Sequence, residues 1–128
     1  MNLSVQVFAL IAALLHVLIF CMESLWFMKP QVYKRFGSKT VEDAESKRLF
    51  AFNQGFYNLF LAIGIFIGLG LLHSDGHLQV AQTLILFCTA SMFFAGIILI
   101  ISGGMRMLRA GVIQLLFPSL TWVLWAWF

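Results

Sequence analysis

Four long runs of apolar residues, separated by short polar segments, make up nearly all of the chain. A helix that crosses the ~30 Å hydrocarbon core of a bilayer needs about 20 mostly apolar residues. The four helices predicted here cover about residues 3–28, 41–72, 78–102 and 110–128, and each contains an apolar run of about that length. The sequence therefore predicts an all-α integral membrane protein, with residues 1–128 forming a single four-helix bundle.

The second predicted helix starts before its apolar part. Thr40 is a typical N-cap residue, and Glu42 and Asp43 follow it near the positive end of the helix dipole. The apolar part begins only near Leu49. We therefore expect this helix to extend a turn or two beyond the membrane.

The composition excludes a soluble globular protein. Of the residues, 62% are hydrophobic and only 10% are charged, which leaves too little polar surface to cover a soluble core. The net charge of +3 does not indicate a nucleic-acid partner, because Lys and Arg lie in short loops beside the apolar runs. Cys21 and Cys88 have no nearby cysteine partner, and we expect no cofactor.

All eight Lys and Arg residues lie in two of the polar segments, six within residues 29–48 and two within residues 106–109. Positively charged loops remain on the cytoplasmic side of a membrane. We therefore expect the N- and C-termini to lie outside and the polar start of the second helix to lie in the cytoplasm. Trp122, Trp125 and Trp127 would then form an aromatic anchor at the outer interface.

Glycines in the middle runs predict where helices pack closely. Small residues are enriched at interfaces between membrane helices because they allow two backbones to approach. Those in the second and third runs are Gly64, Gly68, Gly70 and Gly96. We expect each of them to face a neighbouring helix.

Glu23 is the polar residue that most needs an explanation. An ionisable side chain at the centre of a membrane helix costs ~2.5–3.5 kcal/mol, so it usually marks a functional site. Glu23 lies roughly 7–8 Å from the inner end of the first predicted helix, and His16 lies seven residues earlier on the same face. The two form a candidate acid–base pair. Trp26, one turn beyond Glu23, fits either an interface anchor or part of a ligand site.

Polar side chains on two other helices match the depth of Glu23. Four of them form a stripe on the second helix, at estimated depths of ~6–14 Å from the start of its apolar part. These four are Asn53, Gln54, Tyr57 and Asn58. Gln114 lies at about 6 Å from the inner end of the fourth helix. We predict that these side chains line a ligand site near the cytoplasmic leaflet, although hydrogen bonds between helices would also account for the amides.

His73 and His77 have a spacing that could bind a metal ion if they lay on a helix. Asp75 and Gly76 between them favour a tight turn instead, and a third ligand is missing. The sequence therefore predicts a turn and no metal site at this position.

Several of these residues form motifs that resemble a known family. The motifs are His16, the segment Cys21-Met22-Glu23-Ser24-Leu25-Trp26, Pro30, Phe36-Gly37, the block Asn53-Gln54-Gly55-Phe56-Tyr57-Asn58, Gln114 and Pro118. They resemble a family of small bacterial membrane proteins catalogued as domain of unknown function 1304. The resemblance covers essentially the whole chain. It implies four helices in a bacterial inner membrane, and it supplies no activity.

Three functions fit the predicted site. In the first, the site binds a small polar or amphipathic ligand, with proton-coupled transport as one form of this function. In the second, the protein is a membrane isomerase or epimerase in which Glu23 and His16 act as acid and base. In the third, it is a structural or accessory subunit whose polar layer fixes the helix register. The lipid bilayer is the expected partner in all three, and each is compatible with a homo-oligomer.

Overall fold

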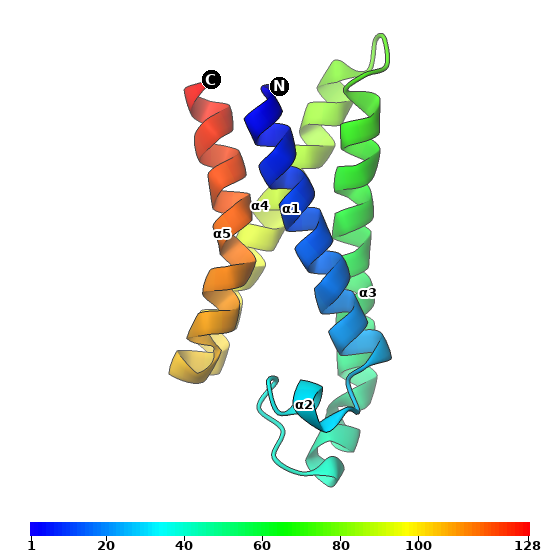
Figure 1. The fold of residues 1–128 in the computed structure, drawn as a ribbon, viewed down its shortest axis with the longest axis vertical. Coiled ribbons are helices and arrows are strands. Elements are labelled where there is room, and N and C mark those ends of the chain that lie inside the picture. Colours follow the sequence, from blue (N-terminus) through cyan, green and yellow to red (C-terminus); the bar gives the residue numbers. More distant parts are fainter.

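The computed structural model describes all 128 residues and contains four long helices and no strand (Figure 1). The long helices are α1 (Leu3–Phe20), α3 (Val41–Leu71), α4 (Leu78–Gly103) and α5 (Leu108–Trp127). Three short elements complete the chain: the π-helix η1 (Cys21–Leu25), the helix α2 (Pro30–Tyr33) and the 3-10 helix η2 (Gly104–Met107). The prediction of an all-helical fold with four long helices is confirmed.

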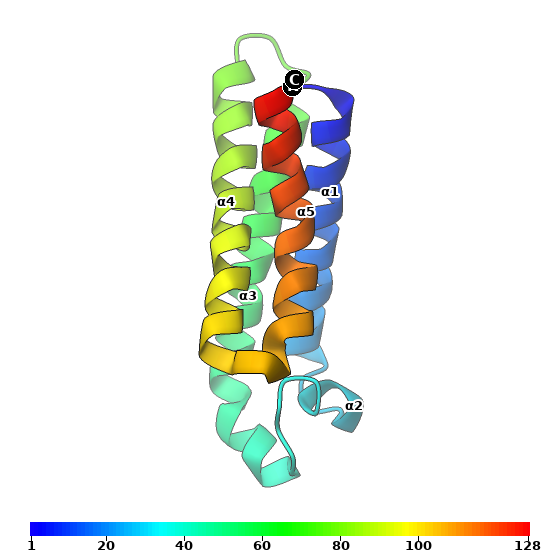
Figure 2. The same cartoon turned by 90° about the vertical axis from the view of Figure 1, so that its left-hand side faces the viewer.

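Three continuous helical stretches are long and apolar enough to cross a membrane: Leu3–Leu25, Val41–Leu71 and Leu78–Trp127. The last stretch contains both α4 and α5, which run in opposite directions side by side (Figure 2). The chain reverses at Gly104, whose φ of 64° lies in the left-handed region that glycine adopts without strain. These apolar stretches are typical of a membrane protein.

The four long helices form a ring in which each helix packs against two neighbours. Helix α1 packs against α3 and α5, and α4 closes the ring by packing against the same two helices. Near the termini α1 lies beside α5, and Phe8 stacks on Phe117 with 6.5 Å between ring centroids. Toward the other end α1 stays beside α3 while α5 stays beside α4, so the two pairs of helices diverge (Figure 1).

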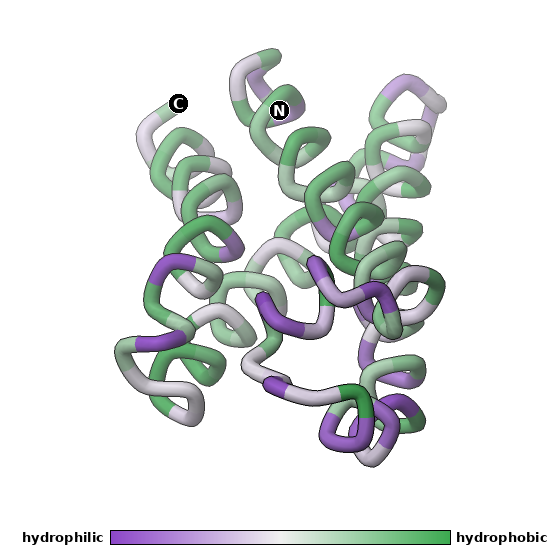
Figure 3. Tube along the Cα trace, turned by 60° about the horizontal axis from the view of Figure 1, so that its bottom comes forward, coloured by the Kyte–Doolittle hydropathy of each residue, from purple (hydrophilic) through white to green (hydrophobic).

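Both termini lie at one end of the bundle, and both basic segments lie at the other (Figure 1). We call the latter the basic end, formed by residues 26–48 and 103–110. It holds all eight Lys and Arg residues of the chain. Figure 3, in which this end is turned forward, shows that most of the hydrophilic segments gather there.

Two apolar clusters are separated by a polar layer. The larger cluster lies toward the termini and consists of Ala9, Ala12, Ala13, Ala62, Ile65, Ile85, Cys88 and Met92. The smaller cluster lies at the basic end, where Phe27 and Tyr33 pack with Ala44 at the start of α3. Along α1 and α3, Glu23 and Asn58 fall between the two clusters. The candidate site therefore lies between the two apolar clusters, beside the contact between Phe20 and Phe56.

Three of the four glycines predicted to face a neighbouring helix do so. A Cβ atom on Gly64 would meet Cys88, and one on Gly68 would lie 3.0 Å from a backbone oxygen of α4. A Cβ atom on Gly96 would lie 3.1 Å from the carbonyl oxygen of Gly111 on α5. These predictions are confirmed. The prediction for Gly70 was wrong, because nothing lies within 4 Å of the position that its Cβ would take.

The start of α3 agrees with the sequence, whereas the end of the first helix differs from it. Thr40 Oγ1 accepts a hydrogen bond from the backbone N–H of Asp43 at 3.1 Å, as expected of an N-cap. The helix that begins at Leu3 ends at Leu25, short of the predicted end at Met28. Its last five residues form a π-helix.

Candidate functional site

The π-helix η1 brings α1 into contact with α3 near the basic end. A π-helix inserts an extra residue into a helical turn, and such turns often occur at functional sites. Ser24, within η1, donates a hydrogen bond from Oγ to the carbonyl oxygen of Phe52 on α3 at 2.8 Å. Its neighbour Glu23 also contacts α3. The sequence alone does not predict η1, because its residues Cys21–Leu25 continue an ordinary apolar helical pattern.

Gly55 allows α3 to approach this π-helix closely. The residue is buried, and a Cβ atom added to it would overlap Ser24 Oγ and lie 3.1 Å from Glu23 Cβ. A larger residue would therefore require the Ser24 side chain to rotate and η1 to move away by a few tenths of an ångström. Gly55 is therefore part of what positions Glu23. The sequence signal for it was a glycine within the polar stripe of the second predicted helix.

Asn58 binds one oxygen of the Glu23 carboxylate. Its Nδ2 atom donates to Glu23 Oε2 at 2.9 Å and to the carbonyl oxygen of Gln54 at 3.1 Å. Asn58 is only 5% exposed, so these bonds hold its amide in a fixed orientation. Glu23 is half-buried, and its other oxygen, Oε1, has no hydrogen-bond partner yet is not enclosed by protein atoms. Oε1 can therefore accept a hydrogen bond from a molecule outside the chain.

The other members of the predicted stripe do not join this pair. Asn53, Gln54 and Tyr57 are exposed on α3, and Tyr57 is 62% exposed. The structure therefore brings Asn58 alone of the four stripe residues to Glu23. The exposed side chains face the surroundings of the bundle at the same level.

Trp26 and Gln114 also lie apart from the Glu23–Asn58 contact. Trp26 is exposed, and Lys29 Nζ lies 5.5 Å from the centroid of its ring. This cation–π contact at the end of a membrane helix is typical of an interface anchor. Gln114 is half-buried on α5, which lies across the ring from α3. Helix α5 belongs to the pair that diverges from α1 and α3 toward the basic end, so Gln114 lies apart from Glu23.

His16 is fully buried between the helices. Its Nδ1 atom lies 2.8 Å from the carbonyl oxygen of Ala12, so Nδ1 carries the proton and donates. In the neutral ring Nε2 is then an acceptor, and it is the only buried side-chain nitrogen or oxygen in the protein without a partner. His16 and Glu23 are about 10 Å apart along the helix axis, so an intervening group would be needed to connect them.

The predicted turn around His73 and His77 is confirmed. Helix α3 ends at Leu71, and Gly76 has a φ of 77° in the turn that follows. Both histidines are exposed. No group of three metal-ligating side chains occurs here or elsewhere in the chain.

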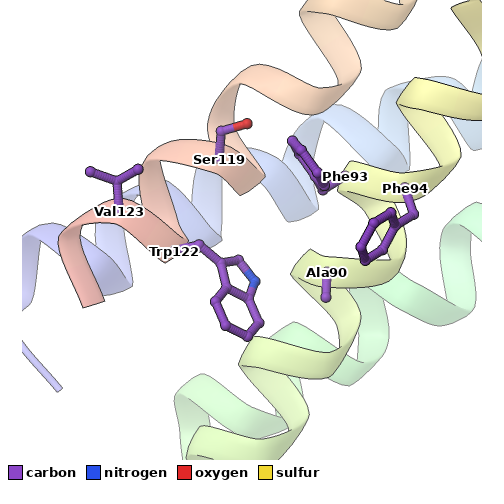
Figure 4. Close-up of a pocket in the computed structure, with 6 residues that line it drawn as sticks. All are labelled: Ala90, Phe93, Phe94, Ser119, Trp122 and Val123. Carbon is purple, nitrogen blue, oxygen red and sulfur yellow. The ribbon is translucent and has the colours of Figure 1, made fainter. Parts of the chain in front are cut away.

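An apolar groove of about 400 Å³ lies between α4 and α5, away from the polar layer. It is lined by Ala90, Phe93, Phe94, Ser119, Trp122 and Val123 (Figure 4). Its polar groups are the Ser119 hydroxyl, which donates to the carbonyl oxygen of Leu115 at 2.7 Å, and the indole nitrogen of Trp122 (Figure 4). Phe94 and Trp122 are exposed, so the groove opens outward toward the membrane. A lipid acyl chain suits such a lining, and the groove contains none of the predicted site residues.

Comparison with known proteins places this arrangement in a family. Residues 10–126, from α1 through most of α5, match the family described as protein of unknown function (DUF1304). The chain belongs to this family. The resemblance predicted from the sequence motifs is thereby confirmed, and the matched region of this DUF1304 protein includes both Glu23 and Asn58. No curated protein and no solved structure matches the chain.

Proposed function

We propose that the protein binds a small polar or amphipathic ligand at the Glu23 carboxylate, within the membrane and near the basic end. The observation that carries this proposal is that only one of the two Glu23 carboxylate oxygens has a hydrogen-bond partner in the protein. Oε2 is held by buried Asn58, whereas Oε1 has no partner within the protein and is accessible. A contact between helices would need only an amide, and an ionised side chain in a membrane helix costs ~2.5–3.5 kcal/mol. A cationic group or an N–H donor on the ligand suits Oε1.

The location and orientation of the bundle are part of the same proposal. All eight Lys and Arg residues lie at the end opposite the two termini, which favours a cytoplasmic location for the basic end. The ligand site then faces the cytoplasmic leaflet of a bacterial inner membrane, as the family resemblance implied. Trypsin should cut residues 29–48 in inverted membrane vesicles and leave them intact in spheroplasts. Cleavage in spheroplasts alone would reverse the orientation.

A carbodiimide reaction tests whether Glu23 offers an accessible carboxyl group within the membrane. Dicyclohexylcarbodiimide is apolar and modifies carboxyl groups that it reaches through lipid. Of the five acidic residues, only Glu23 lies within an apolar run. We expect Glu23 to be modified, and to react faster after the molecules extracted with the protein have been stripped. Peptide mass spectrometry measures both rates, and an unreactive Glu23 in the stripped protein would contradict the proposal.

The buried nitrogen of His16 favours a second candidate function. A membrane isomerase or epimerase needs one group that removes a proton and one that returns it, both in reach of a single substrate. Nε2 of His16 is an acceptor without a partner, and the two residues are about 10 Å apart along the helix axis. A substrate that joins them would have to enter the packing around His16, which is fully buried. Such an enzyme would incorporate solvent deuterium at a carbon atom of the bound molecule during incubation in D₂O. A binding or transport protein would leave its C–H bonds unlabelled.

A further inference from the structure

A polar pocket, separate from the apolar groove between α4 and α5, lies at the basic end where the two basic segments meet. Its volume is about 350 Å³, and no apolar side chain lines it. The residues that line it are Lys34, Gly37, Ser38, Lys39 and Arg106. Three of these five residues are cations, and Arg106 comes from the turn between α4 and α5, far along the chain from the others. Two distant segments thus bring positive charge to one cavity.

The backbone turn that forms one wall of the pocket has a defined conformation. Gly37 has a φ of 83°, and the next backbone N–H, that of Ser38, donates to the carbonyl oxygen of Tyr33 at 3.1 Å. A Cβ atom on Gly37 would lie 3.3 Å from Arg106 Cζ, so the guanidinium group lies against this turn. The glycine at this position therefore leaves room for the Arg106 side chain beside the turn.

Ser38 joins the pocket to the start of α3. It is only 2% exposed, and its Oγ accepts a hydrogen bond from Lys47 Nζ at 3.3 Å. The Ser38 hydroxyl also donates a hydrogen bond to the Asp43 carboxylate, so both sides of the hydroxyl are in use. An anion in the pocket would therefore be bound by the three cations.

None of the three cations is neutralised by an acidic side chain. The protein has two ion pairs, Lys47 with Asp43 at 2.9 Å and Arg48 with Glu45 at 3.3 Å, and neither involves the pocket cations. Asp43 is the nearest acidic neighbour along the chain, and it already accepts bonds from Lys47 and from the backbone N–H of Lys39. Like charges held together repel one another, and a bound anion removes this repulsion.

We propose that this pocket binds a phosphate group, carried either by an anionic phospholipid or by a soluble phosphate compound. Arginine recognises phosphate through two parallel N–H bonds, and lysines add point charges around it. The pocket lies just beyond Gly103, where α4 ends, which is the level of lipid headgroups for a helix that crosses a bilayer. A phosphate here would join the loop after α2 to the turn between α4 and α5. This proposal does not depend on the ligand at Glu23.

Lipid binding by two variants of equal charge tests the proposal. The pocket variant carries Lys34→Gln, Lys39→Gln and Arg106→Gln, and the control variant carries Lys29→Gln, Arg35→Gln and Arg109→Gln. The control removes three cations from the same end without touching the pocket lining. Each cation near an anionic headgroup contributes about fivefold to affinity. Native mass spectrometry should show dioleoylphosphatidylglycerol bound at least about tenfold more weakly by the pocket variant than by the control.

Two further probes identify the source of the phosphate. Dioleoylphosphatidylcholine, which has no net charge, should bind both variants equally. If millimolar inorganic phosphate raises the melting temperature of the control variant but not that of the pocket variant, the site takes a soluble anion. The proposal is overturned if neither phosphatidylglycerol nor inorganic phosphate distinguishes the two variants. If the triple pocket variant does not fold, as a loss of its helical circular dichroism signal would show, two single variants replace the triple ones. Lipid binding is then compared between Arg106→Gln and its control Arg109→Gln.

Discussion

Gly55→Leu is expected to destabilise the protein by about 3 kcal/mol, at the upper end of the range for overpacked sites. The new side chain would overlap Ser24 Oγ, and its Cβ would lie 3.1 Å from Glu23 Cβ. Ser24 cannot easily move away, because its hydroxyl is bonded to the carbonyl oxygen of Phe52 at 2.8 Å. The substitution should therefore separate η1 from α3 and break the bond between Glu23 and Asn58.

Gly70→Leu is the matched control for this prediction. Gly70 lies on the same helix, and nothing occurs within 4 Å of the position that its Cβ would take. The same change there should leave the stability within about 0.5 kcal/mol of the wild type. Unfolding in a mixed detergent with increasing sodium dodecyl sulfate, followed by circular dichroism, measures both variants. Equal stability of the two would show that η1 and α3 are not in tight contact at Gly55.

The long helices could be predicted because membrane thickness sets their length. Each apolar run is long enough to cross a bilayer, and capping residues such as Thr40 mark where a helix starts. The π-helix at Cys21–Leu25 could not be predicted in the same way. This π-helix contacts α3 through the bond between Ser24 and Phe52, two residues that are 28 positions apart in the sequence. A local sequence pattern does not contain that information.

The sequence predicted the level of the candidate site along the helices, but not which side chains point into the bundle. Counting residues along the helices correctly placed Glu23 and Asn58 at one level, where they form a hydrogen bond. The same count could not decide which residues of the stripe face the bundle. Helix α3 buries only part of its circumference against α1 and α4, so Asn58 and Gly55 are buried while Asn53 and Tyr57 are exposed.

The pocket at the basic end could not be predicted, because it forms only when two distant loops meet. Lys34 and Lys39 follow α2, and Arg106 lies between α4 and α5. From the sequence alone, these residues predicted only an orientation of the bundle in the membrane. The contact between Gly37 and Arg106 brings them into a single cavity.

Glu23→Gln is expected to weaken ligand binding by about 10- to 100-fold, the effect of removing the charged partner of a hydrogen bond. Glutamine has nearly the same shape, so the substitution removes the negative charge without removing the packing. Asn58→Leu should act in the same direction, because Asn58 Nδ2 holds Glu23 Oε2 at 2.9 Å. Asn53→Leu, at an exposed position on the same helix, is the matched control.

The most direct test of the ligand site is untargeted mass spectrometry of the small molecules that co-purify with these four proteins in a mild detergent. We expect one molecule that the wild type and Asn53→Leu retain and that Glu23→Gln and Asn58→Leu lose. Its chemistry would show whether the site takes a lipid-like or a polar compound. If all four proteins carry the same molecules in equal amounts, Glu23 binds no ligand and the polar layer serves only to hold the helices in register.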